Sequence, residues 1–146
     1  LKKFLEEPDG WIEDKLNSCL VLSCCYQAMG ENAAAFDILF YSFTMDVPRA
    51  EICCEIGRLF MEKKEYVTAA YWYQQALLAP RKKKNGGFYI ADSHDFIPAI
   101  QMCVCLDKAG RHREAFEFHK KARVLKPLHQ AVIGNEKYFR DVLGME

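Results

Sequence analysis

The sequence predicts an all-α fold, an α-solenoid of about three helix-turn-helix repeats followed by a C-terminal capping helix. The first observation is the segment 50–80, where apolar and small residues recur at helical spacing in two runs separated by polar residues 62–65. Such a pattern is typical of two antiparallel helices joined by a tight turn. The second observation is that the pattern occurs three times, and the third is that a proline closes each unit, at Pro48, Pro80 and Pro127. Recurrence of this kind predicts stacked helical pairs.

The three units are in register. Each has a small residue in its first helix, at Ser23, Gly57 and Cys103. Each then has a polar turn, at 30–32, 64–66 and 110–112. An alanine follows each turn, at Ala35, Ala69 and Ala115. The matched starts Leu16 and Ala50 are 34 residues apart, and Ala50 and Phe96 are 46 apart, so twelve extra residues fall within 81–95, which is typical of a loop. We therefore expect a single domain over 1–146, with repeats at about 16–49, 50–83 and 96–129, an insertion at about 84–95 and a capping helix at about 130–143.

Each helix is expected from its periodicity and its end signals. Residues 1–7 are interpreted as the tail of a preceding helix, and 8–10 as a turn. Gly30 ends the first long helix, as glycine commonly does, and Asp92 or Ser93 is expected to cap the first helix of the third unit. Pro98 is tolerable in the first turn of that helix, where its missing N–H would be unpaired anyway. The expected helices are 11–29, 32–45, 49–62, 65–79, 94–109, 113–125 and 129–143.

These slots resemble the tetratricopeptide repeat (TPR), a 34-residue helix-turn-helix with the pattern W-x2-L-G-x2-Y, then A-x3-F, then P. The middle unit carries the resemblance best, with Cys53, Ile56, Gly57, Phe60, Ala69, Tyr73 and Ala76 at the motif positions. The first unit matches at Leu22, Tyr26 and Ala35 with Leu39 at the aromatic slot, and the third matches at Met102, Leu106, Ala115, Ala122 and Pro127 with His119 at that slot. No unit has the tryptophan. The resemblance spans 16–129 and implies a curved stack whose first helices line a concave groove.

Composition narrows the functional class. The chain has 146 residues, zero formal net charge and 51% hydrophobic residues, which is typical of one packed domain. A neutral domain does not have the basic character expected of a nucleic-acid binder. No apolar run approaches the roughly 18 residues that cross a bilayer, and no signal peptide is visible, so a cytoplasmic location is expected. Because the chain begins with Leu1 rather than methionine, we expect it to be a piece of a longer protein.

The seven cysteines are expected to be buried apolar residues rather than disulfides or metal ligands. They form no C-x-x-C pair, and several occupy matched packing slots of different units: Cys19 with Cys53, and Cys25 with Cys105. Cys103 takes the small-residue slot where two helices approach closely. Buried thiols behave as small hydrophobes, and their abundance indicates a reducing, cytosolic setting.

No catalytic constellation stands out. The histidines His94, His112, His119 and His129 form no H-E-x-x-H motif, no serine lies in a G-x-S-x-G elbow, and no P-loop follows Gly86 and Gly87. His119 fills an aromatic slot, so a packed core residue is favoured over a ligand. We expect no catalytic residue, no metal site and no cofactor in this segment. An enzyme built on these helices would need a buried titratable pair in a pocket.

Two surfaces are candidate binding sites. Under the TPR resemblance, the inward side of the first helices would carry Asn17, Leu20, Cys24, Gln27, Glu51, Cys54, Arg58, Met61, Ile97, Ile100, Val104 and Asp107. This groove would bind a protein or peptide, or would pack against a neighbouring domain. Members that clamp a C-terminal carboxylate have lysines and asparagines where Leu20, Cys24 and Glu55 stand here, so that role is not implied. The basic run Arg81, Lys82, Lys83 and Lys84 is interpreted as a solvated loop beside a helix C-terminus, or as an anion-binding patch facing a phosphate-bearing ligand or membrane surface.

The residue sequence of the repeats also resembles the TPR region that follows the catalytic domain of bacterial family-two glycosyltransferases. The resembling stretches are 49–51 with 55–58, 95–98 with 102–105, and 135–139. That family binds a nucleotide-sugar donor and a divalent metal in its catalytic domain through an acidic D-x-D motif, which is absent from this sequence. The resemblance implies a non-catalytic appendage for acceptor binding, dimerisation or domain packing, with a homodimer possible. The alternative is a stand-alone adaptor that binds a peptide or protein in its groove.

Overall fold

Helices are the only regular secondary structure in the part of the chain that the structure describes. The structure is a computed structural model and describes residues 12–80 and 90–146. Within these ranges there are two short 3₁₀ segments, η1 (Ser42–Thr44) and η2 (Ala91–His94), and no strand. The α-helices are α2 (Ile12–Ala28), α3 (Asn32–Tyr41), α4 (Ala50–Glu62), α5 (Tyr66–Leu78), α6 (Phe96–Lys108), α7 (His112–Leu125) and α8 (Gln130–Asp141). The all-α prediction is confirmed.

None of the helices in these two ranges is both long enough and apolar enough to cross a membrane.

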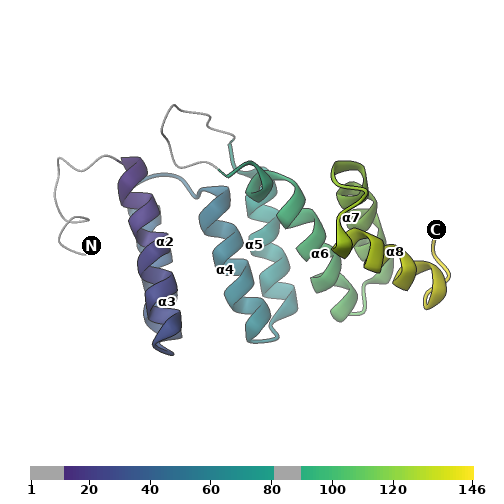
Figure 1. Ribbon diagram of the computed structural model, residues 1–146. Helices are drawn as coiled ribbons and strands as arrows, with labels where there is room; N and C mark the ends of the chain where they lie inside the picture. The colour runs from purple at the N-terminus through teal and green to yellow at the C-terminus, as the bar shows by residue number, and fades with distance from the viewer. Residues whose placement is uncertain (1–11, 81–89) are drawn as a thin grey trace.

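The helices follow one another in a row from the N-terminus to the C-terminus (Figure 1). The helices of α2/α3, α4/α5 and α6/α7 pack together as pairs, and α5 also packs against α6. One side of the row is formed by α2, α4, α6 and α8, and we call it the first-helix face (Figure 1). The helices α3, α5 and α7 form the second layer behind it. Neighbouring first helices also touch through side chains, since Gln27 of α2 contacts Glu55 of α4 and Asp107 of α6 contacts Tyr138 of α8.

The turns inside the three pairs share one backbone geometry. Each contains a residue with positive φ, namely Gly30 (75°), Lys64 (60°) and Gly110 (84°). In each, the next residue donates its backbone N–H to the carbonyl five positions earlier: Glu31 to Tyr26 at 2.8 Å, Glu65 to Phe60 at 3.0 Å and Arg111 to Leu106 at 2.8 Å. These bonds satisfy carbonyls that a helix end leaves open. The three turns that match in the sequence therefore have the same backbone conformation.

The core consists of small residues that allow close approach and larger residues that fill the space between layers. Gly57 of α4 lies directly against the ring of Tyr73 on α5, which is 2% exposed. Leu39 on α3 packs with Ile56 and Leu59 on α4. His119 is fully buried and packs against the rings of Phe116 and Phe139, as its aromatic slot predicts. Burial of these apolar groups is the main stabilising contribution to the fold.

Two predicted helix ends are wrong. The second helix was expected to reach residue 45, but α3 ends at Tyr41 and continues as η1. There the Ser42 hydroxyl donates a 2.6 Å hydrogen bond to the Leu39 carbonyl and competes with the helical pattern. The third unit was expected to be capped by Asp92 or Ser93. Instead, those residues belong to η2, and the Asp95 carboxylate accepts the Phe96 N–H.

Candidate partner-binding surface

Nine of the twelve predicted groove residues have exposed or half-buried side chains on the first helices α2, α4 and α6. Asn17 and Cys24 of α2 are exposed. The half-buried members are Leu20, Gln27, Arg58, Met61, Ile97, Val104 and Asp107. Of these, Gln27 on α2 is joined to Arg58 on α4, so two stretches far apart in the sequence meet at this point.

The other three predicted groove residues are buried, because neighbouring segments cover them. The Glu51 carboxylate accepts the Ile90 N–H at 2.6 Å and lies 3.5 Å from His94 Nε2, and the Cys54 thiol donates to the Ser93 carbonyl at 3.4 Å. Ile100 is 6% exposed in a cluster with residues of α7 and α8. Because η2 lies over the first turn of α4, Glu51 and Cys54 cannot contact a partner in this conformation. The helical pattern of α4 could not predict that η2 covers these residues, because η2 is about 40 residues away in the chain.

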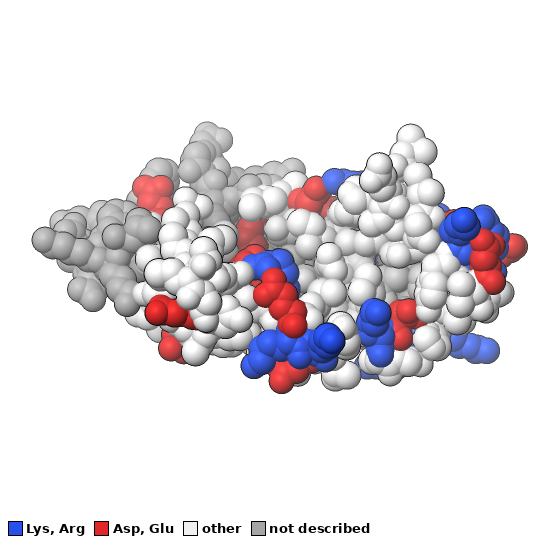
Figure 2. All heavy atoms as spheres, turned by 60° about the horizontal axis from the view of Figure 1, so that its bottom comes forward, with Lys and Arg blue, Asp and Glu red and all other residues white. Residues whose placement is uncertain are grey.

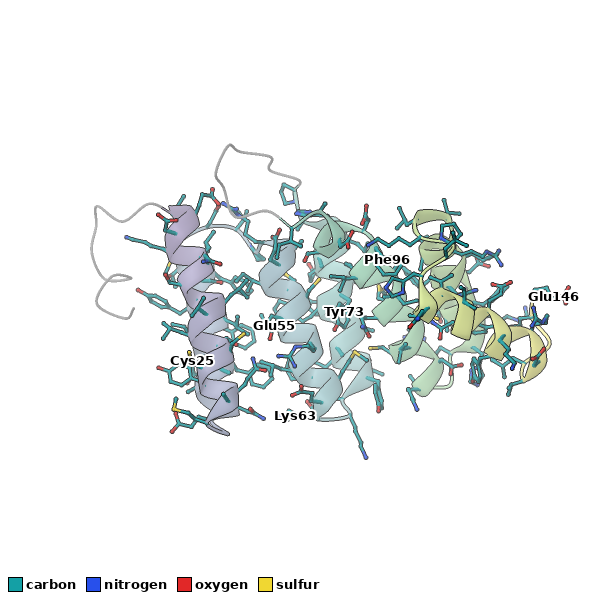
Figure 3. The ribbon with its side chains drawn as sticks, viewed as in Figure 1. Cys25, Glu55, Lys63, Tyr73, Phe96 and Glu146 are labelled. Atoms are coloured by element: carbon teal, nitrogen blue, oxygen red, sulfur yellow. The ribbon has the colours of Figure 1, made fainter. Side chains whose placement is uncertain are left out.

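A polar network joins α2 to α4 on this face. Gln27 Nε2 donates to Ser23 Oγ at 3.0 Å and to Glu55 Oε1 at 3.1 Å. NH2 of the Arg58 guanidinium donates to Gln27 Oε1 and Glu55 Oε1, and NH1 donates to Glu62 Oε1. Figure 3 shows Glu55 on α4 on the side toward α2. The network holds Arg58 in place although its side chain is 42% exposed.

The charges in this network perturb one another. Burial alone would raise the pKa of Glu55, but hydrogen bonds from Arg58 and Gln27 lower it below its ordinary value. The same Glu55 contact raises the pKa of Arg58. Both groups are therefore held in their charged forms at neutral pH, as expected for a paired carboxylate and guanidinium.

The first-helix face continues onto α8 through a pocket of about 200 Å³. Its walls come from α6 and α8 and include Cys103, Val104, Asp107, Asn135, Tyr138 and Phe139. Asp107 is the centre of its polar side, since Oδ2 accepts the Tyr138 hydroxyl at 2.8 Å and Oδ1 contacts His112 Nδ1. The bond to Asp107 raises the pKa of Tyr138. The α8 residues were not among the predicted groove residues, although the spacing of 135, 138 and 139 indicates one helical face.

Acidic and basic side chains alternate where they occur on the surface that Figure 2 shows, and no large patch of one sign is visible there. This distribution agrees with the zero net charge of the sequence. The predicted anion patch Arg81, Lys82, Lys83 and Lys84 lies outside the described residues.

Five of the seven cysteines are buried as predicted, but Cys24 and Cys25 are exposed. Burial raises the pKa of Cys19 to about 11 and those of Cys53, Cys103 and Cys105 to about 12. Cys105, which occupies the same slot as Cys25, packs against residues of α5. Among the described residues no helical pair precedes α2, so nothing equivalent covers Cys25.

A buried titratable pair is present, but it is enclosed. Glu51 on α4 and His94 in η2 are 4% and 5% exposed and face each other, so the pair is buried in this conformation. Within residues 12–80 and 90–146, no group of three or more His, Cys, Asp or Glu side chains is arranged to hold a metal ion.

Neither a scan against known protein families nor a search of curated proteins finds a match to this chain.

Proposed function

We propose that the chain is a TPR-like α-solenoid that acts as a non-catalytic protein-interaction module and binds its partner on the first-helix face. The proposal is supported by the repeated turn geometry, by the pairing of consecutive helices, and by the resemblance of the repeats to the TPR pattern. Stacked helical pairs of this type present an extended surface built from their first helices.

One observation carries the assignment of the face. Side chains from α2, α4, α6 and α8 converge on it and combine a hydrogen-bonded network at Arg58 with a pocket beside Asp107. Both charged groups already have partners inside the protein. A surface ordered in this way before binding loses less side-chain entropy when a partner arrives.

We further propose that the module is an appendage of a larger bacterial glycosyltransferase, where it binds acceptor, mediates dimerisation or packs against the catalytic domain. The support is the sequence resemblance of segments 49–58, 95–105 and 135–139. This proposal predicts no turnover of nucleotide sugars by the purified chain. Transfer or hydrolysis of the sugar by the chain alone, measured by release of nucleoside diphosphate, would contradict the non-catalytic role.

The binding face is tested by purification of the tagged chain with its associated proteins from its source cells. Cys24→Glu places a charge on the first-helix face at an exposed position, so it removes no core packing. Tyr71→Glu is the matched control, because Tyr71 is 56% exposed on α5 in the second layer. We expect one partner to co-purify with the wild type and with Tyr71→Glu but not with Cys24→Glu. The opposite pattern would assign binding to the second layer. Ile100→Asp is not suitable, because it would disrupt the core.

A further inference from the structure

The turn between α7 and α8 carries the two most exposed large apolar side chains in residues 12–80 and 90–146. Leu128 is 85% exposed and Val124 is 81% exposed. Leu125, Pro127 and Ile133 are exposed beside them, and we call these five residues the apolar tip. Single exposed apolar residues are normal on a protein surface, but a group of them marks a contact with another protein or with a membrane.

The tip lies at the upper edge of the row in Figure 1, between two open hollows. One hollow, of about 350 Å³, joins the ends of α5 and α7 and is lined by Leu77, Asp95, Ala99, Lys121, Val124 and Leu125. The other, of about 300 Å³, lies between α7 and α8 and is lined by Arg123, Pro127, Val132, Ile133, Gly134, Glu136, Lys137 and Arg140. The apolar tip therefore has charged residues on both sides.

The charges around the tip are mainly positive in the segment that forms it. Residues 118–135 include four lysines and arginines and no aspartate or glutamate. Acidic residues from outside this segment pair with three of these cations: Glu117 with Lys120 at 2.8 Å, Glu136 with Arg123 at 2.8 Å, and Asp92 with Lys126 at 2.6 Å. The fourth cation is Lys121.

Lys121 and Lys137 flank the tip on opposite sides, and no carboxylate in the described ranges forms an ion pair with either of them. The ammonium group of Lys121 lies 4.6 Å from the centre of the Phe118 ring. Asp95, the acid in the same hollow, accepts the Phe96 N–H at the start of α6. Each hollow therefore has a lysine that is available to an anionic group.

We propose that the apolar tip docks onto the surface of an anionic lipid bilayer. Val124, Leu128 and Ile133 insert roughly 5–10 Å, to the boundary between headgroups and acyl chains. Lys121 and Lys137 bind lipid phosphates, because a lysine stem can lie along apolar groups while its amine stays in the polar layer.

A bilayer suits this surface better than a protein partner does. The tip residues protrude, and a fluid bilayer closes around protruding side chains, whereas a protein would need a hollow of matching shape. Lysines beside an apolar surface also match the negative charge of anionic headgroups. The tip contains no residue of the predicted groove or of the pocket beside Asp107, so the inference does not depend on the proposed protein partner.

The apolar contribution is tested by sedimentation of the full chain with vesicles of phosphatidylcholine mixed with phosphatidylglycerol. Leu128→Asp is expected to weaken partitioning at least about tenfold, because it replaces an inserted apolar side chain with a charge. Val67→Asp is the matched control, since Val67 is 62% exposed in the first turn of α5, at the opposite end of that helix from the tip. Partitioning of the control should equal that of the wild type.

The electrostatic contribution is tested with the same vesicles. Lys121→Ala is expected to weaken partitioning about fivefold. Arg113→Ala is its control, because Arg113 is an exposed cation in the first turn of α7, far from the tip. Vesicles of phosphatidylcholine alone should bind the wild type more weakly, and added salt should reduce binding to the mixed vesicles.

Insertion is measured directly with tryptophan at the tip. Leu128→Trp and Val67→Trp are each mixed with vesicles that contain brominated acyl chains, which quench nearby tryptophan fluorescence. Trp11 and Trp72 are common to both variants, so they contribute equally to the two signals. We expect additional quenching and a blue-shifted emission for Leu128→Trp only.

Three results would overturn the inference: no binding to anionic vesicles, equal partitioning of Leu128→Asp and Val67→Asp, or equal quenching of the two tryptophan variants. A protein adduct from benzoylphenylalanine at position 128 in the source cells, without vesicle binding, would assign the tip to a protein partner instead. Each of these results leaves the proposed function standing, because co-purification with Cys24→Glu tests a different surface.

Discussion

Glu13 and Arg49 form a buried two-point salt bridge that ties α2 to the start of α4. Arg49 NH1 lies 3.0 Å from Glu13 Oε2, and NH2 lies 3.2 Å from Glu13 Oε1. Their side chains are only 3% and 5% exposed, and Arg49 also binds Asp46 at 2.7 Å. The bond fixes the first helical pair relative to the second at the end opposite the Lys64 turn.

Replacement of Glu13 by Gln is expected to destabilise the fold by about 3 kcal/mol, because it leaves the buried Arg49 charge only partly compensated. The free energy of unfolding is measured by urea denaturation followed by circular dichroism. Glu117→Gln is the control, since it breaks an ion pair with Lys120 in which the Glu117 side chain is 64% exposed. That change should cost less than about 1 kcal/mol. Equal effects of both variants would contradict the structural role of the buried pair.

Gly57→Ala is expected to destabilise the protein by about 1–3 kcal/mol. A Cβ atom at this position would lie 2.9 Å from Cε2 of the buried Tyr73 ring, which forces α4 and α5 apart. The same substitution at Gly134, in α8, meets no atom within 4 Å. Gly134→Ala should therefore stabilise the fold by about 0.5–1 kcal/mol through helix propensity. Unfolding midpoints that shift in the same direction for both variants would contradict the packing at Gly57.

Lys64→Gly is expected to stabilise the protein by about 0.5–1 kcal/mol. Lys64 has φ of 60° at the turn position that glycine occupies in the other two pairs. A side chain in the left-handed region carries a steric cost that glycine avoids, although glycine loses more entropy on folding. Gly110→Ala, with φ of 84°, provides the reciprocal change and should destabilise the fold. Thermal melts of both variants check the prediction, and a lower melting temperature for Lys64→Gly would count against it.

Thiol labelling of the native protein at pH 8 should modify two cysteines quickly. Cys24 and Cys25 are exposed, whereas burial raises the pKa of Cys103 and Cys105 to about 12, so almost none of the reactive thiolate forms there. All seven cysteines of the sequence should react in denaturant. The count comes from intact-protein mass spectrometry after a short exposure to iodoacetamide. Rapid modification of more than two sites would indicate a looser core than the one described.

Acid should remove a stabilising contribution that depends on Glu55. Its pKa is lower in the folded protein than in the unfolded chain because burial is outweighed by hydrogen bonds from Arg58 and Gln27. A depressed folded pKa stabilises the fold above the unfolded value and loses that effect as pH falls through the folded value. Glu55→Gln should thus be less stable than wild type at pH 7, with the difference shrinking below the ordinary glutamate pKa. A constant difference from pH 7 to pH 3 would refute this linkage.

The helices were predictable because their signals are local. Apolar spacing, closing prolines and Gly30 or Gly110 after a helix each act within a few residues, and the repeated pattern added independent copies of the same signal. The turn at Lys64 was also predicted correctly, because Lys64 matches the turn positions of Gly30 and Gly110 although it is not a glycine. The end of α3 was missed because a serine hydroxyl, rather than a helix breaker, changes the backbone there.

The binding face was only partly predictable, because its composition depends on contacts between distant segments. Glu51 was expected in the groove from its helical position, yet it is covered by η2 from the insertion. Asn135 and Tyr138 were missed because α8 was considered only as a cap, and their contacts with α6 are 31 or 32 residues apart in the chain. Helical periodicity assigns a residue to a side of its helix but does not specify what lies over that side.

The most direct test of the account is site-specific photo-crosslinking in the source cells. Benzoylphenylalanine replaces Met61 on the first-helix face or Tyr71 on the second layer, and adducts are identified by mass spectrometry. We expect one protein adduct, or a specific crosslink to another part of the same polypeptide, from position 61 and none from position 71. Adducts from position 71 with none from position 61 would contradict the first-helix face as the binding surface.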